Sequence, residues 1–243
     1  MDASVEPIPL HRLALLFVPV LIVVVIQIRW ALSARTSLYA IGRMLLQLLL
    51  IGYVLLFLFE SEHAVLISLV LVVMIAVSSW IALRPIATDR RRLYPAALMA
   101  IAVAGLPVLF LTTEWVLDVT PWYAPRYLIP LAGMIFANAM NSVSIAAERY
   151  ASEFSSGLDH LEARRKAFEA ALIPVINSLL AVGLVSLPGM MTGQVLAGIS
   201  PVIAVRYQIL VMCMLFGSSG IAVACYLYWS NLNHRTRDSK KVQ

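Results

Sequence analysis

Charged residues are scarce in this 243-residue sequence: 13% of its residues are Asp, Glu, Lys or Arg, and 61% are hydrophobic. Soluble domains carry roughly 25% charged residues. A soluble core of this size has no place for so much apolar surface, whereas the interior of a lipid bilayer solvates it. The composition therefore argues against an ordinary soluble protein and predicts one transmembrane domain over residues 1–243.

Catalytic and metal-binding motifs are also missing. The sequence contains no His-Glu-x-x-His, no Gly-x-Ser-x-Gly and no phosphate-binding loop. Its four histidines are scattered, and none has a second ligand at metal spacing. Cys213 and Cys225 would lie roughly 120° apart around one helix, so we do not expect them to pair. We expect neither an enzyme nor a bound cofactor, and any energy for transport has to come from another protein.

Seven apolar stretches reach or approach the length of about 20 residues that a membrane-spanning helix needs. Because the backbone must satisfy its own hydrogen bonds in lipid, each stretch is predicted to be a helix. The stretches are 12–29, 38–59, 64–83, 94–112, 125–147, 171–187 and 202–228. The predicted fold class is all-α, a polytopic membrane protein with about seven transmembrane helices.

Basic residues favour alternate connectors: 14 of the 18 Lys and Arg residues lie in three of these connectors and in the tail 230–243. Glu60, Glu62, Glu114 and Asp118 lie in the connectors between them. The positive-inside rule then places the N-terminus outside the cell and the C-terminus in the cytoplasm. The predicted location is the cell inner (plasma) membrane. Because the basic residues lie between apolar runs, they indicate lipid and not nucleic acid as the partner.

Arg43 and Gln47 lie one turn apart in the second predicted helix. A charge in a spanning helix usually faces protein or water. Arg43 is near enough to the inner end to reach the interface with its side chain. It is equally suited to an ion pair with Glu148 at the end of the fifth helix. Arg43 and Gln47 are therefore candidates for a translocation path, with simple interfacial placement as the alternative.

Asn138 and Asn141 lie three residues apart, on one face of the fifth predicted helix. Asparagine amides in lipid seek partners across helices, so they are either contacts between helices or the polar lining of a path. We also include Asn177, in the sixth stretch, among the path candidates.

The segment from Ser186 to Pro201 is the strongest local signal. Pro188-Gly189 breaks a helix, and broken backbone at membrane depth is tolerated only where it lines a cavity or is buried in protein. The spacing of Gly189 and Gly193 permits close backbone approach. The segment is interpreted as a gate or substrate contact region, or else as an ordinary outer loop. Its candidate residues, with the polar pair that opens the last helix, are Met190, Met191, Gln194, Tyr207 and Gln208.

The connector 148–170 is charged and has a helical pattern, with Glu162–Lys166 and Arg165–Glu169 as favourable i,i+4 pairs. An amphipathic helix here either lies on lipid or docks a cytoplasmic partner. We interpret it as an element that couples the chain to an ATPase. The coupling candidates are Leu161, Glu162, Arg164, Arg165, Phe168 and Glu169.

Several motifs together resemble the bacterial FetB-type iron-export permeases and their plant relatives, which act in aluminium tolerance. The matching residues are Gly42-Arg43 with Gln47 and Gly52-Tyr53, 129–134 with 138–140, 171–174, 182–191, Gly193, 197–198, Pro201 and Tyr207-Gln208. They span nearly the whole chain, and the Leu-Pro-Gly-Met-Met block is the most specific. The connector 148–170 departs from the family, because it is shorter and lacks a leucine-rich Leu-Gly-Ala element.

The resemblance implies the membrane-spanning permease subunit of an ABC transporter. Such a subunit pairs with a separate cytoplasmic ATPase, which uses the ATP, and forms a homodimer. The implied cargo is iron or a related metal, exported from the cytoplasm, while the plant relatives also suggest a nucleotide-sugar cargo. The alternative from a different class is a stand-alone metal channel or secondary transporter.

Overall fold

The computed structural model describes residues 8–60, 63–86 and 89–241, and the side chains of these residues up to 230 except Leu10. The chain divides into two units, 1–61 and 62–243, which are described separately. The basic tail predicted at 230–243 lies almost wholly beyond the described side chains.

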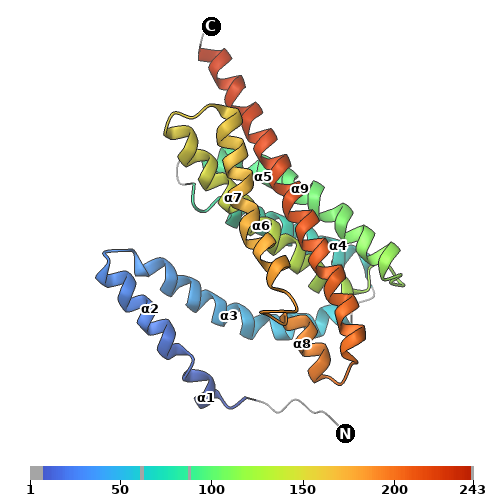
Figure 1. The fold of residues 1–243 in the computed structure, drawn as a ribbon. Helices are drawn as coiled ribbons and strands as arrows, with labels where there is room; N and C mark the ends of the chain where they lie inside the picture. The colour runs from blue at the N-terminus through green and yellow to red at the C-terminus, as the bar shows by residue number, and fades with distance from the viewer. Residues whose placement is uncertain (1–7, 61–62, 87–88, 242–243) are drawn as a thin grey trace. The chain divides into compact units, whose positions relative to one another are not determined.

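Unit 1 consists of α1 (Leu10–Ala14), α2 (Phe17–Arg29) and α3 (Ala34–Phe59), and α2 and α3 form a helical hairpin (Figure 1). Both helices are apolar around most of their circumference, and two spans, His11–Arg29 and Ala34–Phe59, are long and apolar enough to cross a membrane. A helix that is apolar on all sides is typical of lipid contact.

Unit 2 is a bundle in which the longest helix packs against most of the others (Figure 1). The longest helix, α9, contacts α5, α6, α7 and α8, and α6 also packs against α4, α5 and α7. The elements are α4 (Ala64–Ala82), α5 (Arg90–Phe110) continued by the π-helical η1 (Leu111–Val116), α6 (Pro125–Ser155), α7 (His160–Ala181), α8 (Gly189–Leu196) and α9 (Pro201–Lys241).

Local sequence signals set several of these helix ends. The Asp159 side chain accepts a 2.7 Å hydrogen bond from the Glu162 amide and caps α7. Gly157, with φ of 94°, allows the tight turn between α6 and α7. Gly198, with φ of 85°, follows α8 in the left-handed conformation that commonly ends a helix. Pro188 precedes α8, so the predicted interruption of the helix is found, although α7 already ends at Ala181 and Gly189 is the first residue of α8.

Small residues bring the helices of unit 2 close together, as expected for packing in lipid. Ala97, Ala100 and Ala104 of α5 and Ala222 of α9 are almost fully buried. A Cβ atom at Gly105 would lie 2.6 Å from the Phe136 ring of α6, so the contact between α5 and α6 requires glycine there. The core of the bundle is therefore built by close backbone approach.

The predicted all-α polytopic fold is confirmed, since six helices of the described chain are long and apolar enough to span a membrane. The predicted sixth stretch, 171–187, differs from the structure. Its helix α7 begins eleven residues earlier, at the charged end, and stops at Ala181. The Gly183 amide then donates to the Ser186 carbonyl in a turn, so residues 182–188 are not helical. Although α7 is not among the apolar spans, it runs back along α6 (Figure 1).

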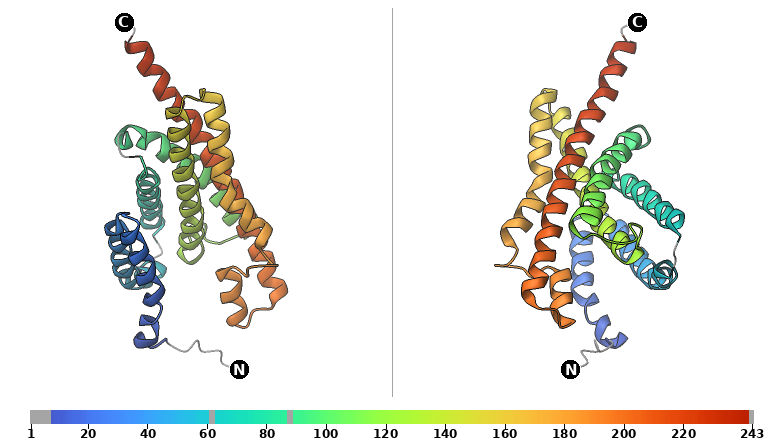
Figure 2. Two further views of the ribbon diagram at one scale, coloured as in Figure 1. Left: turned by 60° about the vertical axis from the view of Figure 1, so that its left-hand side comes forward. Right: turned by 90° about the vertical axis from the view of Figure 1, so that its right-hand side faces the viewer.

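The ends of unit 2 differ in which connectors they hold (Figure 2). The α6–α7 turn, the start of α5 and the C-terminal part of α9 lie at one end, here named the basic end. The α8 end holds connector 117–124, helix α8 and the start of α9. Within unit 2 the connectors therefore alternate between two ends, as the charge pattern predicts.

Candidate functional site

A cavity lies between α6, α7, α8 and α9 and extends from the α8 end toward the middle of unit 2. It has two adjoining parts, of about 590 Å³ near the α8 end and about 470 Å³ deeper in the bundle. Met134 and Met190 line both parts. We name the two parts together the polar cavity. Its polar and sulfur-bearing lining residues are Arg126, Tyr127, Met134, Asn138, Asn141, Ser142, Ser178, Ser186, Met190, Gln194, Tyr207, Gln208 and Met212.

Two glutamine side chains in this lining have unmet hydrogen-bonding capacity. The Oε1 atoms of Gln194 and Gln208 are buried and have no hydrogen-bond partner in the described part of the chain. Gln208 as a residue is 5% exposed. Buried amide oxygens are normally hydrogen-bonded, so an orphaned one needs an explanation such as a bound molecule. Asn138 instead donates to the Met134 carbonyl of its own helix at 3.0 Å.

The structure brings six of the ten predicted path residues together around the polar cavity: Asn138, Asn141, Met190, Gln194, Tyr207 and Gln208. Met191 lines a smaller hollow of about 370 Å³ that adjoins the cavity at Gln208 and Met212. Asn177 is exposed on α7 and lines none of these hollows.

Arg43 and Gln47 lie on exposed positions of α3, in unit 1. Glu148 lies in α6, in unit 2. Because the two units are described separately, the Arg43–Glu148 pair and the place of Gln47 on a path stay predictions.

Sequence reasoning missed several lining residues. Met134 lies one turn before Asn138, so helical periodicity alone would have added it to the same face. Arg126 and Tyr127 begin α6 directly after Pro125, and no pattern in the sequence links them to Tyr207. Their place in the lining follows from tertiary packing.

The polar cavity is neutral apart from one cation. Of the described residues, no Asp or Glu lines either part, and Arg126 is the one charged residue in the lining. Among the described residues, no group of three or more His, Cys, Asp or Glu could hold a metal ion. Its donors are amide and hydroxyl groups together with the thioethers of Met134, Met190 and Met212. Thioethers bind soft metals, while amide oxygens suit hard ions and hydrogen-bonding cargo.

The glycines of α8 face open space within the described chain. No atom lies within 4 Å of a Cβ built at Gly189 or Gly193. The close approach that their spacing permits is therefore not made by any described residue of this chain.

A packed section closes the polar cavity toward the basic end. Among the described residues there, Ala146, Ala171, Ser219 and Ala222 are buried and line neither the polar cavity nor the hollow beyond it. Along α9 the deepest lining residue, Leu215, is nine residues from Ala224, the next residue that lines a hollow, or about 13 Å. The polar cavity therefore does not reach the hollow that begins at Ala224.

At the basic end, α6 and α7 are joined firmly. The Tyr150 hydroxyl and His160 Nδ1 are 2.7 Å apart, and the Phe154 and His160 rings stack with centroids 4.5 Å apart. Lys166 pairs with Glu153 of α6 at 3.2 Å, not with Glu162 as predicted. The predicted Arg165–Glu169 pair is likewise absent from the described salt bridges. Tertiary contacts between the two helices replace the expected pairs along α7.

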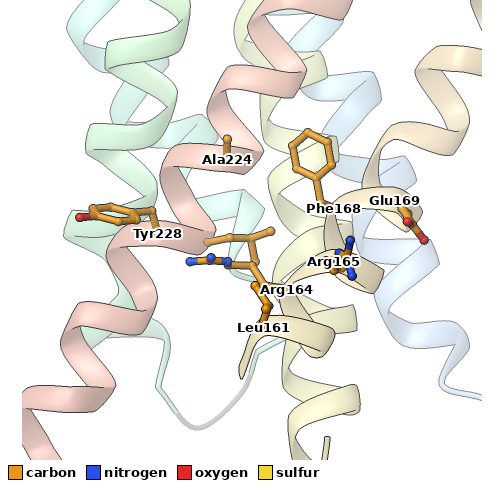
Figure 3. A pocket seen from close by; sticks show the side chains of 8 residues that line it. Leu161, Arg164, Arg165, Phe168, Glu169, Ala224 and Tyr228 are labelled. Carbon is orange, nitrogen blue, oxygen red and sulfur yellow. The ribbon is translucent and has the colours of Figure 1, made fainter. Parts of the chain in front are cut away.

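A second hollow, of about 470 Å³, lies between the N-terminal half of α7 and the C-terminal half of α9 (Figure 3). We name it the arginine groove. Five of the six coupling candidates line it, together with Ala224, Leu227 and Tyr228: Leu161, Arg164, Arg165, Phe168 and Glu169. Glu162 is exposed outside the groove, where its amide completes the α7 cap. The candidates share one location, although their function remains a prediction.

These features define a class: a multi-pass helical membrane protein with a neutral polar cavity between its helices. The family model described as uncharacterised protein family UPF0014 matches residues 10–233. The chain belongs to this family.

Several relatives match most of the chain. The probable iron export permease protein FetB of Escherichia coli is 35% identical over 238 residues, covering 88% of each chain. A UPF0014 membrane protein of Synechocystis is 36% identical over 214 residues, covering 81% of this chain and 83% of the relative. The protein ALUMINUM SENSITIVE 3 of Arabidopsis thaliana is 32% identical over 231 residues, covering 86% and 83%. No solved structure matches the chain.

Proposed function

We propose that this chain is the membrane-spanning permease subunit of an ABC exporter in the cell inner membrane, moving iron or a related metal out of the cytoplasm. The observation that supports it most is the polar cavity, with its orphaned Gln194 and Gln208 oxygens, in a chain 35% identical to a probable iron export permease. Unpaired polar groups facing a hollow favour passage of a polar cargo over a purely structural role.

The cargo leaves the packed helices at the α8 end in this proposal. The polar cavity opens there and is closed toward the basic end by buried small residues. Because no carboxylate among the described residues lines it, a bare hard cation would lose its water without gaining anionic ligands. We therefore propose that the metal travels hydrated or complexed, held by amide oxygens and by the Met134 and Met190 thioethers.

The energy comes from a separate cytoplasmic ATPase that docks at the basic end, on a homodimer of this chain. The α6–α7 turn suits this role because Tyr150–His160 and Glu153–Lys166 join the two helices into one rigid lever. A push on the turn then moves both walls of the polar cavity. The proposed orientation, with the basic end in the cytoplasm, follows the positive-inside rule.

Co-purification tests the docking claim. The chain is co-expressed with a tagged ATP-binding subunit, and Leu158→Asp with Glu162→Lys is introduced at the turn. Neither side chain is buried, so the fold should persist. The amount of this chain recovered with the tagged subunit should fall about tenfold or more. Reversing the charge or polarity of interface contacts costs over ~1.4 kcal/mol of binding free energy.

Arg206→Gln is the matched control, since Arg206 is exposed at the opposite end of the bundle and lines none of the cavities. It should co-purify at the wild-type level. Unchanged recovery of the turn variant would remove the docking claim, and labelling of the turn from outside the cell would reverse the orientation.

A nucleotide-sugar is the second candidate cargo, favoured by the cavity mouth. Arg126, Tyr127 and Tyr207 line it together, a combination that suits a phosphate and a stacked ring. Transport assays in liposomes containing both subunits separate the two candidates: radiolabelled iron and a radiolabelled nucleotide-sugar are offered in parallel. Iron flux without ATP or a partner would instead support a stand-alone channel or secondary transporter.

A further inference from the structure

The arginine groove lies at the depth of the membrane interface. In the sequence the apolar stretch of α9 gives way to polar and basic residues from Ser230 onward, and Tyr228, which lines the groove, is two residues before that change. Tyr and Trp side chains are enriched at this level of a bilayer, and Trp229 is the next residue along α9. The groove is therefore level with lipid headgroups, not with the bilayer centre or the open cytoplasm.

Its walls combine cations with apolar surface (Figure 3). Arg164 extends from α7 toward α9, and Leu161, Phe168 and Leu227 supply apolar wall. A lipid headgroup phosphate would contact the cations, and the first carbons of the acyl chains would contact the apolar side chains. A volume of about 470 Å³ fits within the usual range of small-ligand sites.

The two arginines of the groove have no carboxylate partner. Neither Arg164 nor Arg165 takes part in a salt bridge among the described residues, although Glu169 lines the same groove. Lys166, the residue after Arg165 on α7, is already paired with Glu153. The groove thus keeps a net positive charge that a single phosphate would neutralise.

From this arrangement we infer that the arginine groove binds the headgroup of an anionic phospholipid, with phosphate against Arg164 and Arg165 and acyl carbons along Phe168 and Leu227. Basic pockets between helices on the cytoplasmic side of membrane proteins commonly hold such headgroups. A soluble partner protein fits less well, because it would have to enter the bilayer to reach Tyr228. This inference does not depend on the cargo or on the ATPase.

Native mass spectrometry of the delipidated, detergent-solubilised chain tests it, with dipalmitoyl phosphatidylglycerol and phosphatidylcholine titrated separately. The wild type should retain phosphatidylglycerol more tightly than phosphatidylcholine. Arg164→Gln with Arg165→Gln should weaken phosphatidylglycerol binding roughly tenfold, because each basic side chain near an anionic headgroup contributes to the attraction. Glycerol phosphate, the headgroup without acyl chains, should bind far more weakly than the whole lipid.

Arg84→Gln with Arg91→Gln is the charge-matched control, since both residues are exposed at the same end and line no described cavity. It should leave phosphatidylglycerol binding unchanged. Ala224→Trp fills the groove without removing charge, and it should also abolish selective binding, which keeps the test valid should the arginine variant fold poorly.

Equal loss in both double variants would mean that net charge, not the groove, attracts the lipid, and the proposal would be wrong. Equal affinity for the two lipids would also overturn it. A third contrary result is unchanged lipid binding by the Arg164/Arg165 variant together with lost co-purification of an ATP-binding subunit, because the groove would then hold that protein.

Discussion

The polar cavity and the arginine groove are both walled by α7 and α9, yet they differ in chemistry. The polar cavity offers amides, two of them with unpaired oxygens, together with hydroxyls and thioethers, and no acidic side chain of the described chain lines it. The arginine groove offers two unpaired cations beside apolar and aromatic side chains. They lie about 13 Å apart along α9, and Ser218, Ser219 and Ala222 are buried between them. One helix pair can therefore hold a cargo at one end and a lipid or partner at the other without mixing the two.

Blocking the polar cavity should have the largest effect. Asn141 is exposed to the deeper part of the cavity, so Asn141→Trp fills it without entering the core. Export of iron by cells expressing both subunits should fall to background, as measured by intracellular iron. Ala137→Trp, on an exposed face of α6 outside the cavities, should export normally. Equal activity of the two variants would show that the cavity is not the path.

The close packing of α5 on α6 is tested by Gly105→Ala. The new methyl group would meet the Phe136 ring at 2.6 Å, and overpacking of this kind costs about 1–3 kcal/mol. The melting temperature in detergent should drop. Gly133→Ala is the control, because its Cβ would meet Met74 Cε at an ordinary 3.6 Å. Similar melting temperatures for both would contradict the close packing of α5 on α6.

The orphaned glutamine of the cavity is tested by Gln208→Leu. If the Gln208 amide binds cargo, its loss removes about 1 kcal/mol of binding, or roughly a fivefold change in transport affinity. Thermal stability should not fall, since no hydrogen bond to Oε1 is lost within the chain. Ser219→Ala removes another buried, unpaired polar atom of α9 that lines no cavity, so its transport should match the wild type.

The smallest effect is expected from Tyr150→Phe at the basic end. It removes the 2.7 Å hydrogen bond to His160 and should lower the unfolding free energy by about 1 kcal/mol. Tyr94→Phe removes a longer bond, 3.3 Å to the Ala76 carbonyl, and should cost less. A Tyr150→Phe variant with wild-type stability and full transport would show that the joint movement of α6 and α7 does not need this hydrogen bond.

The long apolar runs were sufficient to predict the helices, because period and length alone decide a spanning helix in lipid. An interruption near Pro188 was predictable because proline lacks the amide hydrogen, but α7 already ends at Ala181, seven residues before it. The extent of α7 was not predictable from hydropathy. Its first half is charged, and the apolar residues between its end at Ala181 and Pro188 are not helical. Hydropathy could not distinguish an apolar turn from the end of a span.

Six of the predicted path residues meet in the polar cavity. Polar side chains in membrane-spanning helices are costly in lipid, so they face other helices or a cavity. Asn177 shows the limit, since one exposed polar position on α7 looks the same in sequence as a lining one. The arginine groove between α7 and α9 could not be predicted from the sequence, because residues 161–169 and 224–228 meet only through tertiary packing. The i,i+4 rule for pairs along one helix likewise could not predict the Lys166–Glu153 pair, which joins two helices.

Reconstituted flux tests the proposed export activity most directly. Liposomes carrying this chain with its co-expressed ATP-binding subunit are loaded with labelled iron, and its movement across the membrane is followed with and without ATP. Transport should require both proteins and ATP, and Asn141→Trp should stop it while Ala137→Trp does not. Iron movement by this chain alone, or none by the intact pair under any condition, would contradict the two-component export of iron proposed here.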